Sequence, residues 1–331
     1  MLLTADGKKS NAWAIGSRLN SHTLQWTVFF IAVQLALGCS DPGGPRPVSA
    51  NSPPQPNAEN LVISYPDPRK LFLRSDAALV VDDRDGRVLY EKKTHAQRPI
   101  ASLTKLMTAM VILDAGLPDK AVITITRADR DRLRGSGSKL SFGTELTRRD
   151  LLKIALAGSE NRAAAALGRT FPGGAEAIVA AMNDKARGLG MKDTAFRDAA
   201  GLHRGNLSTA ADLVILVEAA DRYPLIRELS TVGTDFVTDH RTGWKIRFVN
   251  TNRLVRNGRW NIGLSKTGYI ADSGHCLVMR AEIADRPVIV VLLNSWGELS
   301  KYGDANRIRT WLDHADPKAR RATRAAKESA G

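Results

Sequence analysis

A serine and a lysine three positions apart are the first residues in this chain whose types and spacing can do chemistry. Ser102 and Lys105 follow Pro99 and open an apolar run with helical spacing, SLTKLMTAMVIL. Positions i and i+3 share one face of a helix, so a lysine held neutral there can take the proton of the serine hydroxyl. Backbone N–H groups at a helix start can also face a developing oxyanion. The pair predicts a nucleophile for acyl transfer.

The Ser-x-x-Lys motif occurs a second time, in a different part of the sequence. Ser136 and Lys139 have equal spacing but lie in a glycine-rich stretch, GSGSK, where three residues do not bring side chains to one helical face. Ser-x-x-Lys is expected about once by chance in a chain of this length and lysine content. The elements around each motif therefore have to decide between them.

Two further motifs follow Ser102 in order. Ser159-Glu160-Asn161 lies in a helical region, and Lys266-Thr267-Gly268 lies on a predicted strand, with a near copy at Arg241-Thr242-Gly243. This order resembles the three-motif signature of penicillin-binding proteins and active-site serine β-lactamases. The stretches PIASLTKLMTAMVILDAGLP, GSENRAAAALG, NTNRL, SKTGYIADSGHCLVMR and DANRIRTWL are similar to the D-alanyl-D-alanine endopeptidases among the low-molecular-weight members.

The resemblance covers about residues 75–314 and implies a role for each catalytic position. Ser102 would attack the carbonyl of a D-Ala residue, Lys105 would accept its proton, and Ser159 would relay protons towards the leaving amine. The backbone N–H groups of Ser102 and Tyr269 would form the oxyanion hole. The resemblance makes cleavage of peptidoglycan cross-links the expected activity. Carboxypeptidase relatives share all three motifs, so trimming of terminal D-Ala is the alternative.

The same resemblance implies the substrate-binding positions. Asn161 would hydrogen-bond the substrate backbone. Lys266 and Thr267 would bind the substrate carboxylate and dock the peptide along the sheet edge, and Gly268 would allow close approach. The partners implied are peptidoglycan stem peptides, with β-lactams as covalent inhibitors.

Sheet patterns at both ends and helical patterns between them must position these residues. We expect one α+β domain of β-lactamase/transpeptidase type, with an antiparallel sheet flanked by helices plus a helical lobe. The expected elements are strands 78–83, 87–92, 261–270, 275–283 and 287–293, helices starting near 102 and spanning 304–314, and a helical lobe over about 150–227.

The N-terminus indicates export. An uncharged run, residues 26–37, follows Lys8, Lys9 and Arg18 and fits the apolar part of a signal peptide. It ends in Leu-Ala-Leu-Gly-Cys, which resembles a lipobox and makes Cys39 a candidate for lipidation; ordinary cleavage after residue 50 is the alternative. We therefore predict a periplasmic protein with a possible lipid anchor to the outer membrane.

These patterns divide the chain into a signal peptide (1–38), a flexible tether rich in Pro, Asn, Ser and Gly (39–74), a peptidase domain (75–314) and a disordered basic tail (315–331). Because Cys39 would carry lipid, Cys276 is expected to be a buried free thiol. His275, beside the third motif, is expected to pack rather than to react.

Composition narrows the function class further. The 331 residues are 43% hydrophobic with mean hydropathy −0.21, which excludes a polytopic membrane protein. The net charge of +14 suits anionic surroundings such as nucleic acid, lipid or cell-wall polymer, but no nucleic-acid-binding module is recognisable.

Scattered histidines offer no metal-ligand spacing, and we expect neither metal nor cofactor. No G-x-S-x-G elbow supports a Ser-His-Asp hydrolase. A β-lactamase is an alternative, but the Glu-x-x-Leu-Asn segment of one common β-lactamase class is not visible in this sequence. A catalytically inactive wall-binding module is the remaining alternative.

Overall fold

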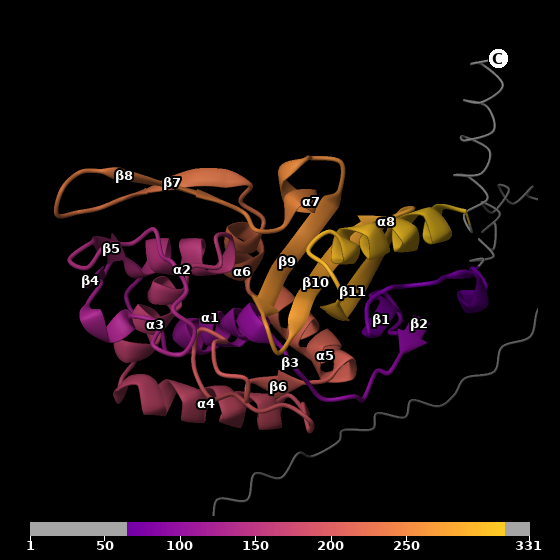
Figure 1. The fold of residues 1–331 in the computed structure, drawn as a ribbon, viewed down its shortest axis with the longest axis horizontal. Coiled ribbons are helices and arrows are strands. Elements are labelled where there is room, and N and C mark those ends of the chain that lie inside the picture. Colours follow the sequence, from indigo (N-terminus) through magenta and orange to yellow (C-terminus); the bar gives the residue numbers. More distant parts are fainter. Residues whose placement is uncertain (1–64, 315–331) are drawn as a thin grey trace, which may run out of the picture. The chain divides into compact units, whose positions relative to one another are not determined.

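Both ends of the described chain build one antiparallel sheet. The computed structural model describes residues 65–314, which lie within the second of two units of the chain, Asn60–Gly331. The five strands stand in the order β2-β1-β11-β10-β9, so β9 is an edge strand (Figure 1). The strands are β1 (Ala77–Asp82), β2 (Val88–Lys92), β9 (Asn261–Ile270), β10 (Gly274–Ile283) and β11 (Arg286–Ser295).

The central strands are apolar on both sides because both sheet faces are covered. Along β1, Leu79 and Val81 join the large core that includes the helical lobe, whereas Ala78 and Val80 join a smaller core under α8. Helices α5 (Ala210–Asp221) and α8 (Ser300–Asp313) contact the sheet from these two cores. A strand buried on both faces needs apolar residues at every position rather than at alternate ones.

A helical lobe lies beside the sheet (Figure 1). Its apolar side chains share the larger core with one face of the sheet. The α+β architecture predicted from the sequence is confirmed. The remaining helices of the lobe are α1 (Thr104–Asp114), α2 (Arg148–Leu156), α3 (Asn161–Arg169), α4 (Gly174–Gly188) and α6 (Pro224–Ser230), with the 3-10 turns η2 (Ala101–Leu103) and η3 (Arg127–Asp129).

A long hairpin was not predicted from the sequence. Strands β7 (Thr234–Thr238) and β8 (Lys245–Val249) pair antiparallel and extend over the lobe on the side opposite α4 (Figure 1). The short helix α7 (Arg253–Arg256) follows. Shorter pairs connect β3 (Arg98–Pro99) with β6 (Leu207–Ser208), and β4 (Val122–Thr124) with β5 (Glu145–Thr147).

The folded part starts earlier than the expected boundary at residue 75. Leu73 is buried, the turn η1 (Pro68–Lys70) precedes it, and the indole N–H of Trp311 on α8 donates to the Asp67 carbonyl at 3.0 Å. Residues 65–74 therefore pack on α8 and are not tether, because their apolar side chains complete the smaller core. The rest of the predicted tether, the signal peptide with Cys39, and the tail lie outside the described residues.

Across residues 65–314, no helix combines the length and apolar character needed to cross a bilayer. Cys276 is a buried free thiol as predicted, and burial raises its pKa. It therefore fills space in the sheet as a small apolar residue.

Candidate active site

The first motif lies where a 3-10 turn runs into α1. Ser102 is in η2, and Lys105 is in the first turn of α1. The α-helix begins at Thr104, two residues after the start near 102 that the sequence predicts. Side chains at i and i+3 nearly eclipse in a 3-10 turn, which aligns the pair. The ammonium Nζ of Lys105 donates to the Ser102 hydroxyl at 2.8 Å. The preceding Ala101 has a φ of 48°, a left-handed conformation that is rare for a residue other than glycine and that occurs most often at functional sites.

Lys105 is completely enclosed, and its three donors are all used. Besides Ser102, its Nζ donates to Asn161 Oδ1 at 2.8 Å and to the Ala200 carbonyl at 2.6 Å. None of these three acceptors is a carboxylate. Burial lowers the pKa of Lys105 to about 7, although nearby carboxylates, Asp198 foremost, act in the opposite direction. A lysine with this pKa can accept a proton near neutral pH.

The Ala200 carbonyl is held in place by a carboxylate that the sequence did not single out. Asp198 Oδ1 accepts from the backbone N–H groups of Ala200 and Gly201 at 2.7 and 2.5 Å, and Oδ2 accepts from His203 N. Gly201 has a φ of 80°, and a Cβ there would lie 2.0 Å from the Ala101 carbonyl. An aspartate three residues before a glycine is a turn signal, the one local feature that could have marked this loop.

The second motif occupies a break between two helices. The stretch LLKIALAGSENRAAAALGR has the helical pattern expected of the lobe, and within it Ser159 has a φ of 57° and separates α2 from α3. The residue that caps α3 is Glu160, whose carboxylate accepts from Arg162 N. This frees the Ser159 hydroxyl, which accepts from Lys266 Nζ at 2.8 Å.

The third motif lies on β9, at the sheet edge. Lys266 is buried, and its Nζ also donates to the Thr267 carbonyl at 3.0 Å. Burial, with the neighbouring charges of Lys105 and Lys301, holds the pKa of Lys266 well below its usual value. The hydroxyl of Thr267 donates to that of Thr251 at 2.6 Å.

Gly268 allows this strand to touch the nucleophile turn. A Cβ at Gly268 would lie 2.9 Å from the Ile100 carbonyl, 3.1 Å from Ala101 Cβ and 3.2 Å from Ser102 N. Real Cβ atoms essentially never approach closer than 3.0 Å. Only glycine therefore permits this distance between β9 and η2.

The three motifs meet in one cleft of about 720 Å³. Of the site residues named from the sequence, Ser102, Ser159, Asn161, Thr267, Gly268 and Tyr269 line it, whereas Lys105 and Lys266 are buried behind it. It also contains residues that the sequence did not assign to the site, and these approach it from separate elements. They are Val249, Asn250, Thr251, Arg256, His275, Glu298, Lys301 and Tyr302.

His275 and Lys301 are the most informative of these additions. His275 stacks on Tyr269 with ring centroids 4.3 Å apart, and burial lowers its pKa. Lys301 is 4% exposed, and burial lowers its pKa as well. Within residues 65–314, no carboxylate lies within ion-pair distance of Lys301, which lines the cleft together with Glu298.

The second Ser-x-x-Lys supports the site without copying it. Ser136 Oγ accepts from Asn161 Nδ2 at 2.8 Å, while Lys139 is exposed and reaches the Arg247 carbonyl at 3.4 Å. The near copy of the third motif, residues 241–243, forms the tip of the β7–β8 hairpin. Neither repeat forms a second nucleophile and base pair.

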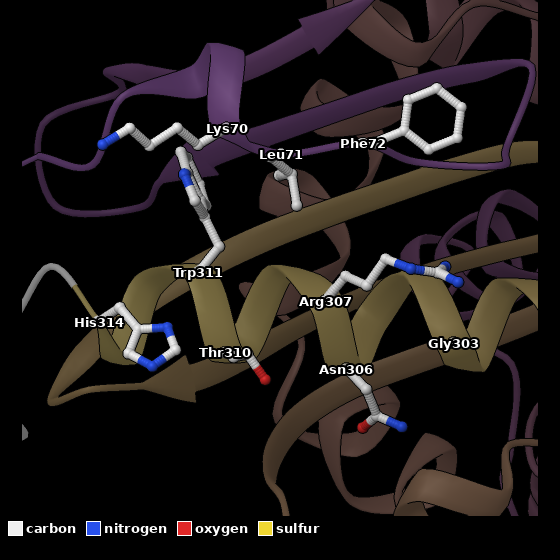
Figure 2. Close-up of a pocket in the computed structure, with 9 residues that line it drawn as sticks. All are labelled: Lys70, Leu71, Phe72, Gly303, Asn306, Arg307, Thr310, Trp311 and His314. Atoms are coloured by element: carbon white, nitrogen blue, oxygen red, sulfur yellow. The ribbon is translucent and has the colours of Figure 1, made fainter. Parts of the chain in front are cut away.

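A groove of about 670 Å³ between residues 70–72 and α8 shares no lining residue with the cleft (Figure 2). Lys70 and Phe72 lie on one side of it and Arg307 and Trp311 on the other, and Phe72 is exposed. No serine or cysteine lines this groove. Among the described residues, no three His, Cys, Asp or Glu side chains gather as metal ligands.

Known proteins show the same fold and sequence pattern. The D-alanyl-D-alanine endopeptidase of Pseudomonas aeruginosa is 43% identical over 266 residues, covering 80% of this chain and 83% of the relative. That of Escherichia coli is 43% identical, covering 73% and 78%. The Streptomyces K15 DD-transpeptidase crystal structure has a TM-score of 0.67 at 26% identity, covering 73% of this chain and 97% of that one.

The carboxypeptidase DacF of Bacillus subtilis is more distant, at 31% identity over 232 residues. A family model described as D-alanyl-D-alanine carboxypeptidase matches residues 66–297, the span that carries all three motifs. The chain therefore belongs to the D-alanyl-D-alanine carboxypeptidase family of serine peptidases.

Proposed function

We propose that this protein is a serine DD-peptidase that hydrolyses D-alanyl peptide bonds in the cross-links of peptidoglycan. The observation that carries the proposal is the 2.8 Å contact between Lys105 Nζ and Ser102 Oγ in a buried site where the pKa of the lysine is about 7. A serine with a neutral amine beside it is equipped for acyl transfer.

The contacts support a sequence of steps. Neutral Lys105 takes the hydroxyl proton as Ser102 Oγ attacks the D-Ala carbonyl, and the backbone N–H groups of Ser102 and Tyr269 stabilise the oxyanion. The C–N bond breaks, the amine leaves with a proton relayed through Ser159, and an ester remains on Ser102. Water then attacks the ester carbonyl and gives one proton to Lys105. The C–O bond to Ser102 breaks, the peptide leaves as a carboxylic acid, and Ser102 Oγ regains its proton from Lys105.

The third motif accounts for substrate binding. β9 is an edge strand, so an extended peptide can pair with it while Asn161 hydrogen-bonds its backbone. An anionic substrate group beside Lys266 raises the pKa of that lysine again and is held by its charge. Ser159 links the second motif to the third, because Lys266 Nζ donates to its hydroxyl at 2.8 Å.

The endopeptidase activity draws support from the relatives named D-alanyl-D-alanine endopeptidase at 43% identity, against 31% for the carboxypeptidase DacF. Carboxypeptidase activity on terminal D-Ala is the second candidate, since the matching family model bears that description. We further propose export to the periplasm with lipid on Cys39, and β-lactams as covalent inhibitors.

Digestion of two defined substrates tests the proposal. A cross-linked muropeptide dimer and a pentapeptide monomer are incubated with the protein and with Ser102→Ala, and products are identified by mass spectrometry. We expect cleavage of the dimer that vanishes in the variant. Release of terminal D-Ala alone would instead establish a carboxypeptidase, and no product from either substrate would refute the activity.

A further inference from the structure

We propose that the outer face of the β7–β8 hairpin binds the carboxylate-bearing peptide chain of the cell-wall substrate, beyond the bond that is cleaved. This inference rests on the proposed function and extends its substrate site. The outer face consists of cross-strand pairs whose side chains point to the same side of the ribbon. They are Thr234 with Val249, Phe236 with Arg247, and Thr238 with Lys245.

The outer face continues directly from the catalytic cleft. Val249, at the end of β8, lines that cleft beside Asn250 and Thr251. Strand residues rise about 3.3 Å each, so Arg247 and Lys245 lie about 7 Å and about 13 Å further along the ribbon. An extended peptide has the same two-residue repeat. A chain leaving the cleft along β8 can therefore place alternate side chains beside the two cations.

The charge of the outer face favours carboxylates. Arg247 and Lys245 are exposed, and within the described part of the chain neither forms an ion pair. Both acidic residues of the hairpin are engaged elsewhere. Asp235, on the inner face, binds Lys153 at 2.8 Å, and Asp239 accepts from groups within the turn.

Apolar contact is available beside the charges. Phe236 lies opposite Arg247 on the outer face and is 47% exposed. Exposed aromatic rings flanked by cations are costly to leave in water and are enriched at recognition surfaces. The combination fits a peptide with carboxylates separated by short apolar groups.

The hairpin is held in position before any substrate arrives. Its inner face buries Val237 and Phe248 in the large core. At the tip, His240 N donates to the Glu145 carbonyl at 2.8 Å, and Arg241 Nε donates to the Gly143 carbonyl at 2.8 Å. A surface fixed at both ends loses little entropy on binding.

Binding without turnover isolates this surface. In the Ser102→Ala protein, the affinity for a cross-linked muropeptide dimer is measured by calorimetry with Lys245→Glu/Arg247→Glu added. We expect about tenfold weaker binding, and about threefold weaker with Lys245→Gln/Arg247→Gln. The matched control, Arg187→Glu/Lys192→Glu, makes the same charge change at the end of α4 and beyond it, on the opposite side of the lobe (Figure 1), and should stay within twofold.

Several results would overturn the inference. These are a loss below twofold, an equal loss in the control, or an equal loss for peptide-free glycan strands, which would assign the face to sugars. Penicillin acylation of Lys245→Glu/Arg247→Glu with Ser102 intact should stay within twofold, and a tenfold loss there would place the effect in the cleft. Failure of the wild-type protein to cleave the dimer would refute the proposed function while leaving the binding comparison valid.

Discussion

Ser102 and Lys105 form the same Ser-x-x-Lys motif as Ser136 and Lys139, yet the two pairs have different environments and different roles. In the first, a 3-10 turn and a helix bring hydroxyl and ammonium to 2.8 Å inside the protein. In the second, the serine accepts from Asn161 Nδ2 and the lysine is exposed. Spacing produces chemistry only where an element aligns the side chains and burial changes the lysine pKa.

The largest effect expected from this comparison is at the two lysines. Lys105→Ala should lower the rate of acylation by penicillin about 1,000-fold, because general-base catalysis is lost. Lys139→Ala should stay within twofold, since its amine reaches only the Arg247 carbonyl. Stopped-flow acylation with a fluorescent penicillin measures both. Acylation of Lys105→Ala at the parental rate would refute the base assignment.

The next largest difference in acylation rate is expected between alanine substitutions at Gly268, in the third motif, and at Gly137, in the second Ser-x-x-Lys. Gly268→Ala forces a Cβ to within 2.9 Å of the Ile100 carbonyl and should slow acylation about 100-fold by displacing β9 from the nucleophile turn. At Gly137, a Cβ meets nothing within 4 Å and φ is not in the left-handed region. Gly137→Ala should leave acylation unchanged and raise the unfolding free energy by about 0.5 kcal/mol. Equal kinetics for the two variants would contradict the close approach.

The pH profile separates the buried lysine from an ordinary one. A base works when unprotonated, and the pKa of Lys105 is about 7, so acylation should rise with pH through about 7 and level off above it. At pH 6 the rate should be about tenfold below the plateau. Measuring the acylation rate constant from pH 5 to 9 tests this. A flat profile would show that no group with this pKa controls the step.

The smallest effect concerns the serine of the second pair. Ser136→Ala removes the acceptor for Asn161 Nδ2, and acylation should fall about fivefold as the amide that contacts Lys105 loses its orientation. Ser141→Ala, at an exposed position in the same loop, is the control and should be neutral. No change in either variant would mean that the Asn161 orientation is set without Ser136.

Much of the site could be predicted because the residues of each motif are close in sequence, and the elements around the first and third motifs have a visible period. The helix that follows Ser102 and the strand that carries Lys266 are visible as periodicities in the sequence. The predicted ends of β9, β10 and β11 lie within two residues of those in the structure. The break at Ser159 was missed because its left-handed φ follows from Lys266 and Glu160, which the apolar period of α2 and α3 does not encode.

Contacts between distant segments lie beyond such patterns. The Ala200 carbonyl, its Asp198 anchor and Lys301 reach the site through tertiary packing alone. The β7–β8 hairpin was missed because both of its faces mix polar and apolar residues. Its inner face carries Asp235 beside Phe248, which obscures the alternation of a half-buried strand.

The position of the covalent penicillin adduct shows directly whether Ser102 is the nucleophile. The protein is incubated with penicillin at pH 8, digested, and the acylated peptide is sequenced by mass spectrometry. We expect one adduct, on Ser102, that is absent in Ser102→Ala. An adduct on Ser136 or Ser159, or none on the wild-type protein, would contradict the assignment of Ser102 as the nucleophile.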